Sequence, residues 1–225
     1  PIPNSSTSSI TSTCTTRTTP CLAHPPSSPT NRPNEGPSFR CFQLLFVGLL
    51  NFLGDLQCFS LCPLNLQVTN VYNANDANDI PHPPHLVSIF LAATIPTLFL
   101  FSSIFRKLGQ KNTLLLGSFL LAFGSPVKTM FSFRFGYAIM GFSQPLYQVS
   151  CCTHSSIWHK SKERVSATAL LLSCDQIGIG AAYLVGGVVI RNYLMLEEYL
   201  LGLTVVSFGL FLYGVVWGCR DYGRE

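Results

Sequence analysis

The sequence predicts an all-α, polytopic membrane protein with six transmembrane helices. Of its 225 residues, 48% are hydrophobic and only 11% are charged, whereas soluble domains carry roughly 25% charged residues. Six apolar segments are long enough to cross a bilayer, and short polar loops separate them. Basic residues gather in alternate loops, as in proteins that thread back and forth through a membrane.

Each predicted span can cross a hydrocarbon core about 30 Å thick at 1.5 Å per helical residue. Helix is the expected conformation because lipid offers no hydrogen-bond partner to an open backbone. The spans are Cys41–Leu64, Leu86–Phe105, Thr113–Phe131, Phe135–Ile157, Val165–Ile190 and Tyr199–Gly218.

The predicted domain organisation follows these spans. Residues 1–39 are rich in Ser, Thr and Pro and contain no apolar run, so we expect a disordered cytosolic tail. A Ser/Thr-rich, acid-poor start also resembles an organelle transit peptide. Residues 40–220 form the six-helix transmembrane domain, and residues 221–225 begin a cytoplasmic loop. The first residue is Pro1, so we expect an incomplete or processed N-terminus.

Loop charges predict the orientation. The loop 72–85 has no Lys or Arg and contains Asp76 and Asp79. The basic residues of the two loops on the other side are Arg106, Lys107, Lys111, Lys160, Lys162 and Arg164. The positive-inside rule therefore places both termini in the cytoplasm. We expect an integral, multi-pass protein of the plasma membrane or of an organelle membrane.

Several functional classes lack their signatures. The basic residues form no single patch of the kind that binds nucleic acid. Most of the nine cysteines lie inside apolar segments, and no CxxC pair recurs at zinc spacing. No phosphate-binding GxxxxGK, GxSxG elbow or HExxH is present. We therefore predict no enzyme activity, no cofactor, no metal site and no nucleic-acid partner.

The first span carries polar residues on one helical face. These are Gly48, Asn51, Asp55, Cys58 and Cys62, with Gln57 beside them. A carboxylate near the bilayer centre costs about 2.5–3.5 kcal/mol on insertion scales. We therefore expect Asp55, Gln57 and Cys58 to line the bundle interior or a water-filled cavity. The alternative is that Asp55 only bonds a neighbouring helix.

The fourth span has a similar stripe, formed by Gln144, Gln148, Cys151 and Ser155. Pro145 should kink this helix or free a carbonyl. Gln144 and Gln148 are candidates for substrate contact. They are equally candidates for packing, since amides bond across membrane helices at an average of about 0.6 kcal/mol.

The fifth span has a small residue at every fourth position, namely Cys174, Gly178, Ala182 and Gly186. This pattern predicts close approach to another helix. Asp175 and Gln176 lie in the same span, and Gln176 is a further candidate for the cavity lining. Asp175, like Asp55, either exchanges a proton during transport or pairs with a neighbouring donor.

The segment Phe105–Lys111 (FRKLGQK) is similar to the loop signature of the major facilitator superfamily. That superfamily usually has an Asp-Arg pair before the glycine, whereas this chain has Arg106 and Lys107. The signature's acidic member is therefore absent. The resemblance implies a gating loop formed by Arg106, Lys107, Gly109 and Lys111.

The chain also resembles the feline leukaemia virus subgroup C receptor-like transporters, through short stretches in a shared order. These stretches are Ile95–Phe99, Leu116–Phe119, Ser143–Trp158, Glu163–Ala169 and Asp175–Gly187. The resemblance implies that the first and fourth helices line a central cavity, with choline-like amines, haem or vitamins as proposed cargo. Gln144 matches a family glutamine, Cys58 replaces a frequent tryptophan, and Asp175 stands where asparagine is common. Asp55 has no usual counterpart.

The resemblance implies the N-terminal half of a transporter whose two six-helix halves are each built from inverted three-helix repeats. We expect the chain to be a fragment, or to pair with a second six-helix half. The expected function is transport of a small organic solute across a lipid bilayer by alternating access. The alternative is a non-transporting scaffold or receptor on the same fold.

Overall fold

The computed structural model describes residues 37–64, 83–189 and 193–222, which all belong to one unit, Glu35–Glu225. Within those residues the secondary structure is helical and contains no strand. The all-α prediction is therefore confirmed for this part of the chain. Most of the predicted tail and of the acidic loop 72–85 lies outside the described residues.

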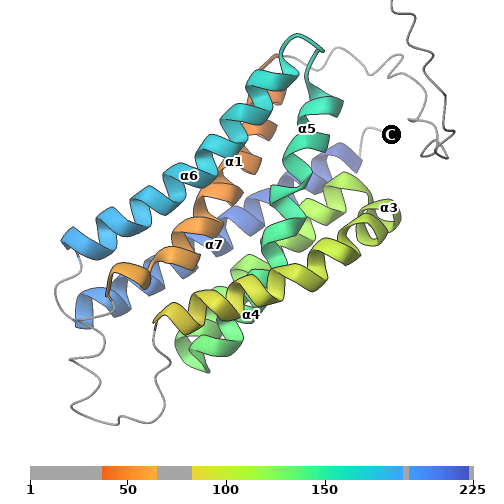
Figure 1. The fold of residues 1–225 in the computed structure, drawn as a ribbon. Coiled ribbons are helices and arrows are strands. Elements are labelled where there is room, and N and C mark those ends of the chain that lie inside the picture. The colour runs from red at the N-terminus through yellow and green to blue at the C-terminus, as the bar shows by residue number, and fades with distance from the viewer. Residues whose placement is uncertain (1–36, 65–82, 190–192, 223–225) are drawn as a thin grey trace, which may run out of the picture. The chain divides into compact units, whose positions relative to one another are not determined.

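Helical segments lie along each of the six predicted spans, but their ends are shifted and their division into helices differs (Figure 1). They are α1 (Pro37–Phe59), the 3-10 turn η1 (Cys62–Leu64), α3 (Pro83–Met130), α4 (Phe133–Gln148), α5 (Ser150–Trp158), α6 (Arg164–Leu184), the π-helical turn η2 (Val185–Val189) and α7 (Tyr193–Tyr222). Pro37 and Pro83 each open a helix, where proline is tolerated because the first N–H groups have no intrahelical partner.

The second and third predicted spans are joined in α3 with almost no loop. This 48-residue segment consists of two helices on either side of Gly109, whose φ of 75° and ψ of 170° are not helical. A residue with a side chain rarely adopts that conformation, and glycine does so at little cost. The sequence predicts a loop between Phe105 and Thr113, but the structure confines the break to one residue.

Four of the described helices are long and apolar enough to cross a membrane. They are Cys41–Phe59, His85–Met130, Arg164–Val188 and Met195–Val216. The predicted fourth span is divided between α4 and α5 at Val149, so neither part reaches spanning length by itself. The count of six spans therefore stays a prediction.

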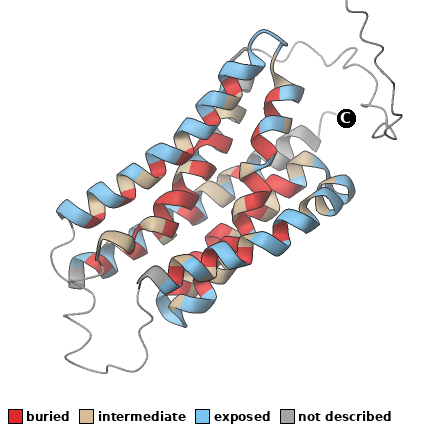
Figure 2. Ribbon diagram, in the orientation of Figure 1, coloured by how far each residue is buried: buried red, intermediate tan, exposed pale blue. Residues whose placement is uncertain are grey.

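Helix α1 is the central element of the bundle. It contacts α3, α4, α6 and α7, and 56% of its apolar segment is buried, compared with 17–28% for the other three candidate spans. Figure 2 shows mostly buried and intermediate residues along α1, whereas exposed residues run along α6. The polar residues of α1 are therefore surrounded by protein.

The outer surface is apolar. Large hydrophobic side chains on α3, α6 and α7 are exposed, among them Phe99 at 82%, Ile177 at 60% and Val205 at 62%. A soluble protein rarely exposes apolar surface so extensively, whereas lipid tails cover such a surface readily. The exterior is that of a protein embedded in a bilayer.

Candidate functional site

A buried polar cluster lies where α1, α4 and α6 meet. Its members are Asp55 of α1, Gln144 and Gln148 of α4, and Asp175 of α6. Asp55 is 2% exposed and Asp175 is 5% exposed, while both glutamines are half-buried. We call these four residues the acid–amide cluster.

Each acid of the cluster accepts a hydrogen bond from one glutamine. Gln144 Nε2 donates to Asp55 Oδ1 at 3.0 Å, and Gln148 Nε2 donates to Asp175 Oδ2 at 2.9 Å. The glutamines are one helical turn apart on α4, so this helix presents two donors at the spacing of the two acids. The two glutamines of the predicted stripe thus reach both α1 and α6.

The two carboxyl groups are also close enough to interact directly with each other. Asp55 comes from α1 and Asp175 from α6, so this contact joins two segments far apart in the chain. In the sequence, the acids appear as separate candidates. Their meeting is a result of the packing between α1 and α6.

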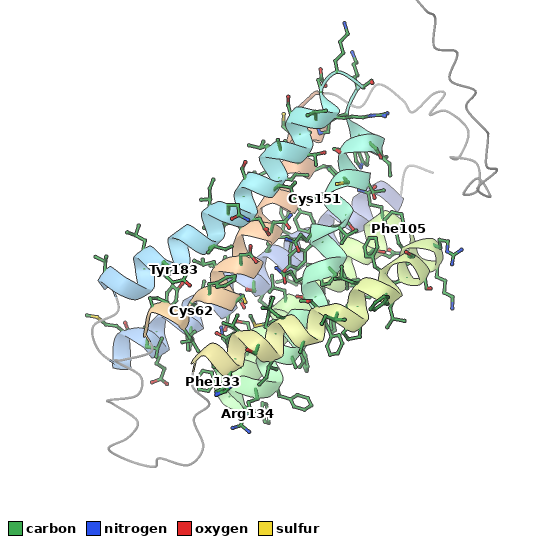
Figure 3. The ribbon with its side chains drawn as sticks, viewed as in Figure 1. Cys62, Phe105, Phe133, Arg134, Cys151 and Tyr183 are labelled. Carbon is green, nitrogen blue, oxygen red and sulfur yellow. The ribbon has the colours of Figure 1, made fainter. Side chains whose placement is uncertain are left out.

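Small residues allow that packing. A Cβ atom added to Gly178 would lie 3.1 Å from the backbone C and Cα atoms of Phe52, and one added to Gly48 would lie 3.2 Å from Cys174 Sγ. Gly186 lies directly against Pro63. At the same end of the contact, Cys62 and Tyr183 are neighbours (Figure 3). The prediction that the small-residue stripe marks a close helix contact is confirmed.

A second close contact positions α1 against α4 and α5. Gly54 has no side chain and packs against the ring of Tyr147. One turn before Asp55, Asn51 Nδ2 donates to Cys151 Sγ at 3.1 Å and to Val47 O at 3.0 Å. Cys151 lies on α5 (Figure 3). These contacts bring the polar face of α1 to the level of the two glutamines.

The three other residues predicted to line a cavity lie elsewhere. Gln57 is buried and bonds Ser207 Oγ and Leu203 O of α7 through its amide nitrogen. Cys58 belongs to the hydrophobic core, and Gln176 is exposed. Adjacent residues on a helix point about 100° apart, so neighbours of a cluster residue face different surroundings. Their predicted role in solute binding is not tested by this arrangement.

The predicted gating loop surrounds the kink of α3. Arg106 and Lys107 are exposed, and Gly109 is the residue at which the helix breaks. The next residue, Gln110, forms a hydrogen bond of 2.9 Å between its Nε2 and His154 Nδ1 of α5. The kink is therefore tied to α5, an attachment that the sequence pattern does not indicate. The gating role of Arg106, Lys107, Gly109 and Lys111 stays a prediction.

Sequence reasoning missed Lys128. Its ammonium group is buried and lies 5.4 Å from the centre of the Tyr137 ring, and it has no hydrogen-bond partner among the described residues. It is the only Lys or Arg inside the six predicted spans. That position was the available signal, because charged residues inside membrane spans are rare and often functional.

Comparison with protein families identifies a match over most of the chain. The family model of the Major Facilitator Superfamily matches residues 47–223, which include the whole acid–amide cluster. A search of curated proteins found no match.

Proposed function

Because the chain belongs to the major facilitator superfamily, we propose that it is the N-terminal half of a secondary transporter for a small organic solute. The acid–amide cluster is the observation that carries this proposal. Buried carboxylates are costly inside a membrane, and they commonly mark solute or ion pathways. A bundle that only had to pack would gain more from apolar or small residues at these positions.

The proposed half has six spans. The apolar part of α3 has 46 residues and would measure about 69 Å at 1.5 Å per residue, more than twice the hydrocarbon thickness of about 30 Å. We therefore count its two arms as two crossings. Helices α4 and α5 together supply a third, and α1, α6 and α7 complete the set.

Loop charges support the proposed orientation, with both termini in the cytoplasm. A membrane-impermeant maleimide applied from outside should label the variant Asn75→Cys and leave Lys162→Cys unlabelled. The opposite labelling pattern would invert the topology.

In transporters of this architecture the solute site lies between the two halves. Gln144 and Gln148 are half-buried, and they bond the two acids through only one donor hydrogen each. Each amide therefore retains polar atoms for a solute. We propose that the half-buried Gln144 and Gln148 form the part of the solute site contributed by this half, with the buried Asp55 behind Gln144, and that a second six-helix half covers the two glutamines.

The likeness to feline leukaemia virus subgroup C receptor-like transporters supports a small organic cargo. Cys58 replaces the tryptophan frequent in those proteins, and it lies in the hydrophobic core. An aromatic face that could attract a quaternary ammonium group is therefore missing at this position. The proposed cargo is a small organic solute without a requirement for that aromatic contact.

Metabolite profiling would test the transport function. Cells that express the chain together with its second half should accumulate or lose at least one small organic solute relative to cells that express neither half. Glu198→Gln, a change of an exposed acid on α7, should behave like the unaltered protein. Identical metabolite profiles in all three cell lines would favour the alternative, a scaffold or receptor on the same fold.

A further inference from the structure

The two acids of the cluster lie in surroundings that do not neutralise two negative charges. They face each other across the contact between α1 and α6, and both are almost completely buried. Within residues 37–64, 83–189 and 193–222, their hydrogen-bond donors are the neutral amides of Gln144 and Gln148, and neither acid forms an ion pair.

The other titratable groups near the two acids are thiols and a phenol, which carry no positive charge. Cys58 of α1 and Tyr147 of α4 lie near Asp55, and Cys151 of α5 lies near Asp175. The ammonium of Lys128 on α3 faces Cys58 and the ring of Tyr137 instead. None of these groups supplies a positive charge directly to the carboxyl pair.

The hydrogen bonds at the two acids show where a proton is required. The glutamine amides occupy one oxygen of each acid, Asp55 Oδ1 and Asp175 Oδ2. The other oxygen of Asp175, Oδ1, is buried and receives no hydrogen bond from the part of the chain that the structure describes. The side-chain oxygen Oδ1 of Asn51, one turn before Asp55, is also buried and receives no hydrogen bond from the described residues. Buried polar oxygens nearly always receive a hydrogen bond, so the site lacks donors.

We propose that Asp55 and Asp175 form one proton-binding site, in which a single proton is shared between their facing oxygens while Gln144 and Gln148 hold the other oxygens. Two ionised carboxylates in contact repel each other strongly. The proton removes one charge and gives Asp175 Oδ1 its missing donor. Gln144 and Gln148 are positioning residues, since their N–H groups determine which oxygens remain acceptors.

This inference deepens the proposed function, because a proton held at the solute site is one that a transport cycle can use. It does not depend on transport for its test. Replacement of either acid by asparagine should remove the same proton. The new amide donates a hydrogen bond where the proton lay, and the remaining carboxylate no longer faces a second negative charge.

Infrared spectroscopy of the purified protein can count this proton. The chain is placed in lipid nanodiscs at neutral pH with carboxyl-labelled ¹³C-aspartate, and the isotope-shifted carbonyl band of protonated carboxyl groups is measured. We expect one protonated aspartate per chain, and none in Asp55→Asn or in Asp175→Asn. The control Glu198→Gln should retain it.

Three outcomes would overturn the shared site. The unaltered protein could show no protonated aspartate. It could also show two protonated aspartates, with one protonated aspartate remaining in each variant. One variant could also keep the proton while the other loses it, which would assign the proton to a single acid. The count in the unaltered protein requires no variant to fold. A correct proton count combined with absent solute transport would disprove the proposed function alone.

Discussion

The contact between α1 and α6 can be tested at Gly178. A methyl group at this position would lie against the backbone of Phe52, 3.1 Å from its C and Cα atoms, whereas ordinary van der Waals contacts of a Cβ atom begin at 3.4 Å. Backbone atoms cannot rotate away as a side chain can. The variant Gly178→Ala should therefore push α1 and α6 apart and separate Asp55 from Asp175.

The magnitude follows from that overlap. Extra methyl groups forced into a packed interior cost about 1–3 kcal/mol, which is roughly a 5- to 150-fold change in the unfolding equilibrium. Gly180 is a matched control two residues away on the same helix, because among the described residues no other part of the chain lies within 4 Å of its added Cβ. Gly180→Ala should stabilise the helix by about 0.5–1 kcal/mol, because alanine loses less backbone entropy than glycine.

The assay is unfolding of the purified chain in mixed micelles with increasing SDS, followed by helical circular dichroism. Gly178→Ala should unfold at a lower SDS fraction than the unaltered protein, and Gly180→Ala at an equal or higher one. If the two variants unfold together, the close contact of α1 with α6 does not limit stability, and our account of how the acids meet is wrong.

Four further predictions concern other parts of the bundle. Gly109→Ala should cost about 1–3 kcal/mol in the same unfolding assay, because its φ of 75° and ψ of 170° are strained for alanine; an unchanged midpoint would show that the kink can relax. Lys128→Met should raise the unfolding midpoint by removing a buried ammonium without a hydrogen-bond partner, and a large loss would instead indicate an anionic partner. Gln57→Leu should lower stability by about 0.5–1.5 kcal/mol, since it removes the amide that bonds Ser207 of α7; an equal effect of Gln176→Leu at an exposed site would argue against that bond. In the complete transporter, Asp55→Asn and Asp175→Asn should each abolish the dependence of uptake on a pH gradient and leave solute exchange largely intact, and gradient-driven uptake by both variants would make the acids structural.

The sequence alone was sufficient for the membrane-embedded helical fold. Apolar runs of spanning length and scarce charges are local properties, and lipid leaves helix as the available conformation for such segments. The ends were less predictable. The break at Gly109 spans one residue instead of a loop, because glycine permits a backbone conformation that ends one helix and begins the next.

The candidate site was predictable residue by residue, because burying a carboxylate in a membrane is costly and Asp55 and Asp175 are conspicuous for that reason. Their pairing was not. Helical periodicity shows which face of a segment is polar, but it does not show which other segment that face will meet. Gly178 against Phe52 and Gly54 against Tyr147 decide how closely α1 approaches α6 and α4. The packing of backbone against backbone, which depends on residues far apart in the chain, brings the two acids together.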